Sequence, residues 1–139
     1  MLVPMDHSPL ARRALDPLEV HPSAAITVLH VVDYVEESYG AELLVGPEEL
    51  ESRAEERTEA LTEALFESAR ALAATAGTPV TTVTRFGDPA RTTVEYADTT
   101  DADLVVIGSH GRSLISRVLL GDPVDAVVHR APMPVTVGR

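Results

Sequence analysis

Cysteine and lysine are both absent from this chain, and each absence removes whole classes of function. Without cysteine there are no disulfides, thiol nucleophiles, iron–sulfur clusters or cysteine-bound zinc, and a reducing compartment is expected. Without lysine there is no Walker-type phosphate loop and no Schiff-base chemistry. A receiver domain, which Asp6 alone would suggest, also needs a lysine after its last strand and is set aside.

The chain also lacks the features that direct a protein to a membrane or to nucleic acid. No segment approaches the roughly 20 apolar residues of a spanning helix, and residues 1–9 do not resemble a signal peptide. The formal net charge is −11, from 22 acidic and 11 basic residues, so a basic face for nucleic-acid phosphates is not expected. We therefore expect a cytoplasmic protein with neither a membrane nor nucleic acid as its partner.

All 11 basic residues are arginine, and the acidic residues are unevenly spread. Twelve of the 22 acidic residues lie between Asp33 and Glu67, which is typical of a solvated helix face and loop. An acidic surface without lysine indicates adaptation to high internal salt, as in a halophilic archaeon. A GC-rich genome that favours arginine codons is the alternative explanation.

Apolar runs alternate with helical patterns along the whole chain, without a repeat or a low-complexity tract. Strands are expected at residues 2–5, 25–32, 80–86, 103–107 and 133–137. Helices are expected near 10–15, from Pro47 to Gly77, around 94–97 and between 121 and 130, with a mobile loop over 34–46. This alternation predicts one α/β domain over residues 1–139, with helices on both faces of a parallel sheet.

Candidate ligand residues follow the strands, because open α/β sheets bind ligands beyond the carboxyl ends of their strands. Asp6 follows the first strand, Asp33 the second, and Gly108-Ser-His-Gly111-Arg112 the fourth. Backbone N–H groups of a glycine-containing loop suit phosphate, and an arginine side chain suits an anion. Alone, two glycines three residues apart are more typical of a tight strand-to-helix turn.

No catalytic residue is assigned from the sequence. His30 lies within an apolar strand and is interpreted as a hydrogen-bonded core histidine. His110 either contacts a ligand or caps a turn, and its position next to Ser109 does not make a catalytic dyad. The chain carries no zinc-protease, EF-hand or nucleophile-elbow motif, so the only enzyme considered is a slow ATPase.

Three segments in sequence order resemble the universal stress protein family, over nearly the whole chain. They are Pro4-x-Asp6-x-Ser8-Pro9, Leu29-His30-Val31-Val32-Asp33 and Val106-Ile107-Gly108-Ser109-His110-Gly111-Arg112. The resemblance implies a three-layer αβα fold of the adenine nucleotide α-hydrolase-like type, with five parallel strands in the order 3-2-1-4-5. It also implies an ATP or AMP site between strands 1 and 4, where the strand order reverses.

The same resemblance implies a set of nucleotide-binding residues. Asp6 and the backbone of Val31 would hold the adenine, with Pro4 and Met5 along the wall of the site. Gly108 and Gly111 would meet the ribose and phosphates. Along the phosphate side would lie Arg112, Gly121, Asp122, Pro123 and Val124.

One position departs from the family pattern. The spacing Gly108-2x-Gly111-9x-Gly121 is present, but Asp122 stands where ATP-binding members carry serine or threonine. An ionised carboxylate repels a triphosphate unless a cation bridges them. Four interpretations of Asp122 follow. It helps to hold Mg²⁺, it restricts the site to AMP or another less charged ligand, it leaves the site without a ligand, or it simply caps a helix that begins at Pro123. Pro123 also lacks the N–H that another residue would offer to a phosphate.

Three functions follow from these observations. The first is a regulatory module that binds an adenine nucleotide, and the second is a stress-linked interaction or scaffold protein whose site is altered by Asp122-Pro123. The third, a slow ATPase, has the least support. The apolar segment Met133 to Val137 would form a sheet edge, and the family resemblance implies that it pairs with a second subunit in a homodimer. The alternative is an edge covered by the chain's own loops.

Overall fold

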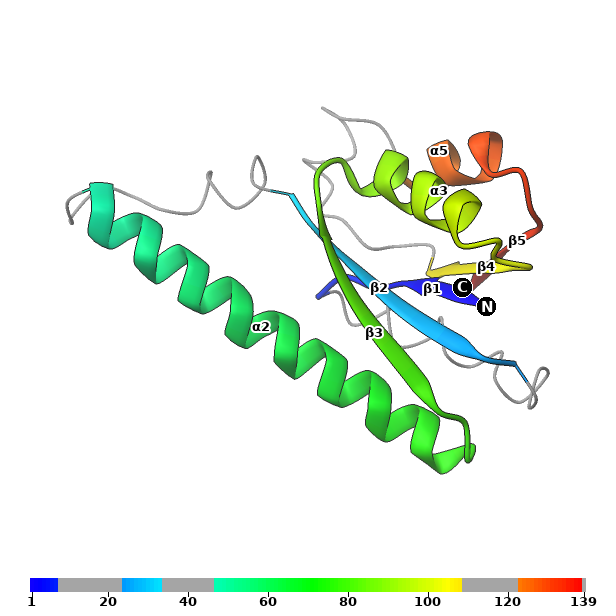
Figure 1. Ribbon diagram of the computed structural model, residues 1–139, viewed down its shortest axis with the longest axis horizontal. Helices are drawn as coiled ribbons and strands as arrows, with labels where there is room; N and C mark the ends of the chain where they lie inside the picture. Colours follow the sequence, from blue (N-terminus) through cyan, green and yellow to red (C-terminus); the bar gives the residue numbers. More distant parts are fainter. Residues whose placement is uncertain (8–23, 34–46, 109–122, 139) are drawn as a thin grey trace.

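A computed structural model describes residues 1–7, 24–33, 47–108 and 123–138 of the chain (Figure 1). The short helix expected near 10–15, the loop expected over 34–46 and most of the glycine-containing loop after the fourth strand lie outside these residues. No helix in the described ranges is long and apolar enough to cross a membrane.

Five parallel strands form one sheet in the order β3-β2-β1-β4-β5, which confirms the expected topology. The strands are β1 (Leu2–Pro4), β2 (Ile26–Val32), β3 (Val80–Phe86), β4 (Val105–Gly108) and β5 (Val135–Gly138). β1 is central, because Leu2 pairs with Thr27 of β2 on one side and with Val105 of β4 on the other.

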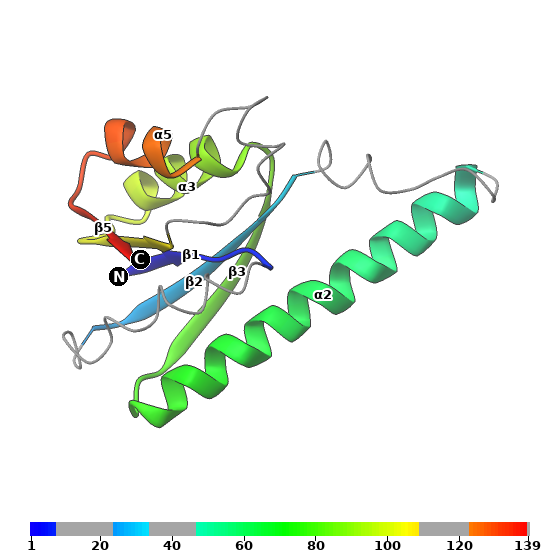
Figure 2. The ribbon, with the colours of Figure 1, turned by 180° about the vertical axis from the view of Figure 1, so that it is seen from behind.

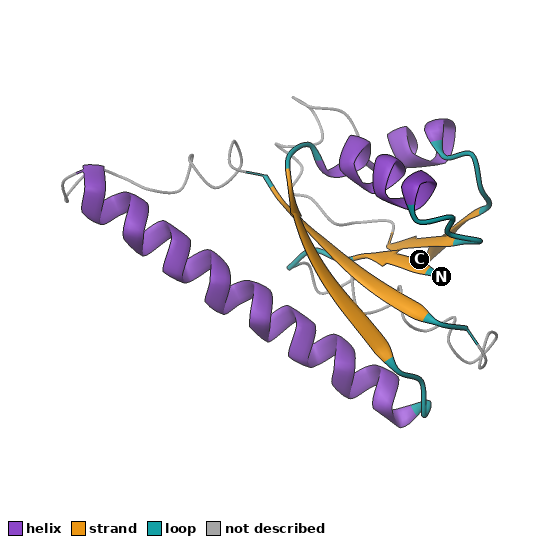
Figure 3. Cartoon of the chain, viewed as in Figure 1, coloured by secondary structure: helices purple, strands orange, loops and turns teal. Residues whose placement is uncertain are grey.

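Helices cover both faces of the sheet (Figures 1 and 3). The long helix α2 (Pro47–Thr75) lies on one face, and the shorter helices α3 (Pro89–Thr99) and α5 (Pro123–Arg130) lie together on the other. Side chains alternate across the strands, so the central strands supply two apolar layers. The α2 layer includes Val3, Met5, Val28, Phe66, Ala69 and Val106. The opposite layer includes Leu2, Leu29, Ala90, Ala97, Val105 and Val127.

The helix α2 is much longer than the strands beside it. Its 29 residues span about 44 Å, whereas a strand of seven residues such as β2 spans about 23 Å. Its described buried residues begin at Thr62, and every described residue from Ser52 to Arg57 is exposed. The amino-terminal half of α2 therefore extends past the sheet into solvent (Figure 2), and the acidic side chains Glu55, Glu56 and Glu59 are solvated as expected.

The turn from β3 into α3 shows why the local sequence starts a helix there. Gly87 has a φ of +137°, which L side chains rarely adopt, and its N–H donates to the Val32 carbonyl at 3.0 Å. Asp88 is the N-cap, with its carboxylate accepting from the Arg91 N–H at 2.8 Å, and Pro89 begins the helix. A turn glycine, a capping aspartate and a proline at the first helical position thus start α3.

Replacing Asp88 with alanine is expected to lower the free energy of unfolding by about 1 kcal/mol, because the first turn of α3 loses its side-chain acceptor. Asp88→Ser, which keeps an acceptor oxygen at the cap, is the matched control. Urea unfolding followed by circular dichroism measures both variants. An equal loss in the two variants would show that the cap interaction does not stabilise this turn.

Candidate functional site

The candidate site lies where the carboxyl ends of β1, β2 and β4 meet. In a sheet of order 3-2-1-4-5 the strand order reverses between β1 and β4, and this is where open α/β sheets bind ligands. Asp6 lies two residues beyond the end of β1, and Gly108 is the last residue of β4. The structure therefore places these two predicted site residues on the two sides of the switch point.

β1 is shorter than its neighbour β2, and this difference shapes the site. The register between them runs over three pairs and ends at Pro4 with Leu29, whereas β2 continues to Val32. The last three residues of β2 therefore extend past β1 on that side. Met5, which is buried at 4% exposure, follows β1 directly and donates its N–H to the Leu29 carbonyl at 2.8 Å.

The backbone of Val31 is directed toward the space beyond β1. In β2 the backbone groups alternate: the Thr27 N–H donates to the Met1 carbonyl of the β1 side at 2.9 Å, and the Val32 carbonyl accepts from Gly87 on the β3 side at 3.0 Å. Val31 lies an even number of residues after Thr27, so its N–H and carbonyl point to the same side as those of Thr27, which is the β1 side. There β1 has already ended, so the backbone of Val31 faces the space beyond the end of β1.

His30 is a core histidine with a hydrogen-bond partner, as the sequence predicts. Its ring is buried at 5% exposure, and its Nδ1 lies 3.0 Å from the Met5 carbonyl oxygen. A carbonyl only accepts, so Nδ1 carries the proton and donates it. The exposed ring of His7 meets the His30 ring edge-on, with centroids 4.8 Å apart. The segment Met5 to His7 is thus held against β2 by His30, an effect that sequence reasoning missed.

The acidic residues that follow the strands differ in their surroundings. Asp6 and Asp33 follow β1 and β2 and are both partly buried, whereas the Asp88 carboxylate caps α3. Within residues 1–7, 24–33, 47–108 and 123–138, no group of three or more His, Asp or Glu side chains is placed to hold a metal ion. Asp122, the residue considered above as a Mg²⁺ ligand, lies outside the described residues.

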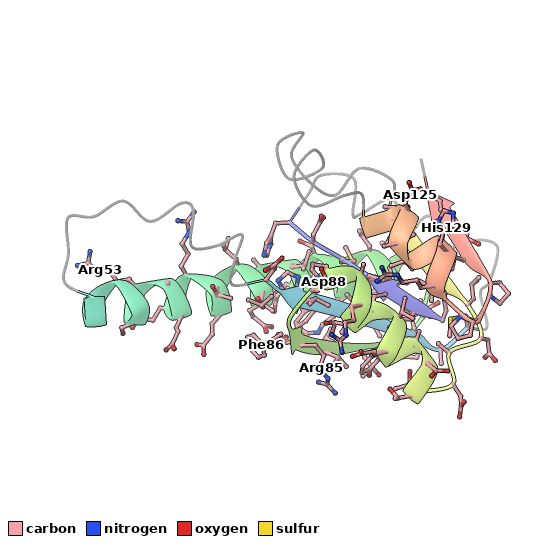
Figure 4. The ribbon with its side chains drawn as sticks, turned by 90° about the horizontal axis from the view of Figure 1, so that it is seen from above. Arg53, Arg85, Phe86, Asp88, Asp125 and His129 are labelled. Carbon is pink, nitrogen blue, oxygen red and sulfur yellow. The ribbon has the colours of Figure 1, made fainter. Side chains whose placement is uncertain are left out.

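The predicted phosphate side is described only at its end. Gly111, Arg112, Gly121 and Asp122 lie outside the described residues, as does His110. Pro123 is the first residue of α5, which lies within the range 121–130 where a helix is expected, and Val124 packs against the layer that contains Leu2 and Val127. Asp125, in the first turn, is exposed, and its carbonyl accepts from His129 Nδ1 at 2.8 Å (Figure 4).

Arg85 and Phe86 lie at the carboxyl end of β3 (Figure 4) and were not identified from the sequence as candidate functional residues. Phe86 is 59% exposed, which is unusual for a large aromatic side chain, and the Arg85 guanidinium lies 5.2 Å from the centre of the Tyr96 ring. Among the described strands β3 pairs with β2 alone and forms one edge of the sheet, which explains the exposure. The edge position of β3 follows from the strand order, and no sequence pattern within the strand indicates it.

Comparison with known proteins gives a consistent result over the whole chain. A profile of the universal stress protein family matches residues 1–139. Universal stress protein YxiE of Bacillus subtilis is 30% identical over 144 aligned residues, which cover 100% of this chain and 97% of that protein. A universal stress protein of Mycobacterium tuberculosis is 44% identical over 61 residues, 44% of this chain, but that match spans only 20% of the relative's length.

Solved structures share the fold. Universal stress protein UspA from Lactobacillus plantarum has a TM-score of 0.75 and 27% identity, covering 99% of this chain and 95% of that one. A universal stress protein in complex with cAMP gives a TM-score of 0.70 at 23% identity, covering 99% of this chain and 94% of that one. The protein from Archaeoglobus fulgidus in complex with dAMP gives 0.64 at 17%, covering 99% and 95%. The fold is the adenine nucleotide α-hydrolase-like fold.

Proposed function

The chain belongs to the universal stress protein family, and on that premise we propose that it binds an adenine nucleotide, ATP or AMP, at the carboxyl ends of β1, β2 and β4. The bound nucleotide would make the chain a small regulatory module of the stress response, with ligand occupancy altering a surface that a protein partner recognises. This activity needs no catalytic residue.

The observation that carries the proposal is the arrangement at the switch point. Asp6 and Gly108 lie on its two sides, and the backbone N–H and carbonyl of Val31 point into the space that β1 leaves by ending at Pro4. A backbone N–H and carbonyl side by side match the acceptor and donor on the edge of an adenine base. Two structures of the same fold, solved with cAMP and with dAMP, support an adenine nucleotide as the class of ligand.

Charge favours either a small anion or a metal-bound one. The chain carries a net charge of −11, and Asp6, Asp33 and Asp125 are among its acidic residues near the carboxyl ends of the strands and the start of α5. Asp122 adds a further carboxylate, next to a proline that lacks an N–H. We propose that AMP binds without a metal, and that ATP binds when Mg²⁺ offsets its extra charge.

Isothermal titration of the purified protein with AMP and with ATP, with and without Mg²⁺ and at low and high KCl, checks this function. We expect one nucleotide per chain, and we expect Mg²⁺ to tighten ATP binding by about tenfold while leaving AMP nearly unchanged. GMP serves as the base control and should bind more weakly than AMP. If neither adenine nucleotide binds under any of these conditions, the proposal is wrong.

The alternative function is that of an interaction or scaffold protein whose site no longer takes a nucleotide. The observation that favours it is Pro123 at the first position of α5, directly after Asp122. This helix start offers a potential phosphate one N–H fewer than another residue would, beside a negative charge.

Asp122→Ser separates the two functions, with Asp122→Asn as a neutral control that also keeps a helix-capping side chain. If the chain binds nucleotide through Mg²⁺ and Asp122, the serine variant binds ATP with a smaller Mg²⁺ dependence than the parent. If the parent binds nothing and the serine variant binds ATP, the interaction or scaffold function is favoured.

We also propose that the chain forms a homodimer through β5. β5 is the edge strand opposite β3, and Val137 is 39% exposed on it. The Pro134 carbonyl accepts from the Val105 N–H at 3.0 Å, so even-numbered residues of β5 face β4. The N–H of Val137 therefore points away from the sheet, where a second subunit could pair with it.

Val137→Pro is expected to convert the dimer to a monomer, because it removes an outward N–H while leaving the β4–β5 pairing intact. Val137→Thr keeps this N–H and a β-branched side chain, and is the matched control. Light scattering after size-exclusion chromatography measures the mass. A monomeric parent, or a proline variant that stays dimeric, would contradict dimerisation through this edge.

A further inference from the structure

We infer that His30 is a positioning residue: it takes the Met5 carbonyl and so leaves the backbone N–H of Val31 available for a ligand. The inference rests on the proposed adenine-nucleotide function and adds to it a residue that would not itself touch the ligand. Its basis is that the Met5 carbonyl, which is the regular ladder partner of the Val31 N–H, is directed to the His30 side chain instead, at the point where β1 ends.

If the hydrogen-bond ladder between β1 and β2 continued regularly, the Val31 N–H would be paired and would not be available to a ligand. β1 and β2 pair in parallel, and the Met5 N–H already donates to the Leu29 carbonyl at 2.8 Å, one residue past the end of β1. In a parallel ladder the next bond would run from the Val31 N–H to the Met5 carbonyl. That bond does not occur among the described residues. The Met5 carbonyl accepts from His30 Nδ1 at 3.0 Å instead.

The surroundings of His30 stabilise the hydrogen bond from its side chain to the Met5 carbonyl. The ring is 5% exposed and Met5 is 4% exposed, so neither polar group can turn to bulk water, and a buried hydrogen bond of this kind is costly to lose. The edge-on contact with His7 covers the ring where the chain turns away from β1. The hydrogen bond uses only the protonated Nδ1, so any side chain with an N–H at that place can replace it.

Two adjacent residues of β2 therefore have different roles, one through its side chain and the other through its backbone. His30 points its side chain into the α2 layer, which contains Val28 and Met5, and there it binds the segment that follows β1. Val31 presents its backbone to the β1 side. Without the His30 donor, the Met5 carbonyl would be left with the Val31 N–H as its nearest regular partner, and the ladder would extend into the ligand position.

The first arm of the test measures AMP affinity by titration for His30→Leu and His30→Asn. Leucine fills a similar volume without a donor, whereas the asparagine amide N–H reaches about the place of Nδ1. We expect His30→Leu to weaken AMP binding by about tenfold, as for the loss of one hydrogen bond to the ligand, and His30→Asn to restore most of it. Weak GMP binding should change little. Equal affinities in the parent and His30→Leu would overturn the inference.

The second arm uses amide hydrogen exchange without ligand, so it does not depend on nucleotide binding. In the parent, the Val31 N–H should exchange much faster than that of Leu29, because it lacks a ladder bond. In His30→Leu it should slow, as it pairs with Met5. Slow exchange of Val31 in the parent would overturn the inference even if AMP binds. A parent that shows fast exchange at Val31 but binds no nucleotide would instead refute the proposed function.

Discussion

The structure depends on one constraint, which is that the central strand β1 is short. Its register with β2 ends at Pro4, three residues before β2 ends. A longer β1 would satisfy the backbone of β2 up to Val32 and fill the switch point with a regular ladder. Because it stops early, the following segment must be held by other means, and the His30 side chain holds it at Met5. The ladder between β1 and β2 is thus interrupted at the place where we propose that a ligand binds.

The two apolar layers make that interruption tolerable. Val3 and Val28 are fully buried on the α2 side, and Leu29 and Val105 on the opposite side, so the centre of the sheet is packed from both faces. Packing of this kind stabilises the folded sheet through the apolar area that it removes from water, and this stabilisation does not depend on every hydrogen bond of the ladder. The site can therefore lack a strand pairing while the sheet around it remains well supported.

Much of this architecture was predictable because buried parallel strands have a strong local signal. Residues 80–86 are expected as a strand and form β3 over that range. The helix expected from Pro47 to Gly77 runs from Pro47 to Thr75, and Gly77, two residues later, has a φ of +66°. The site was less predictable. That Asp6 and Gly108 lie on either side of one point follows from strand order, which only the family resemblance supplied. The partner of His30 lies 25 residues away along the chain, and no sequence pattern identified it.

The sequence by itself determined the class of fold, the positions of the described strands and the helix starts at Asp88-Pro89 and Pro123, because these depend on local apolar patterns, caps and proline geometry. It also ruled out lysine and cysteine chemistry by composition. Only the tertiary structure decided where β1 stops relative to β2, and therefore which carbonyl His30 binds and which way the backbone of Val31 faces. Such choices arise from the register between segments distant in sequence, and register is set by packing in three dimensions.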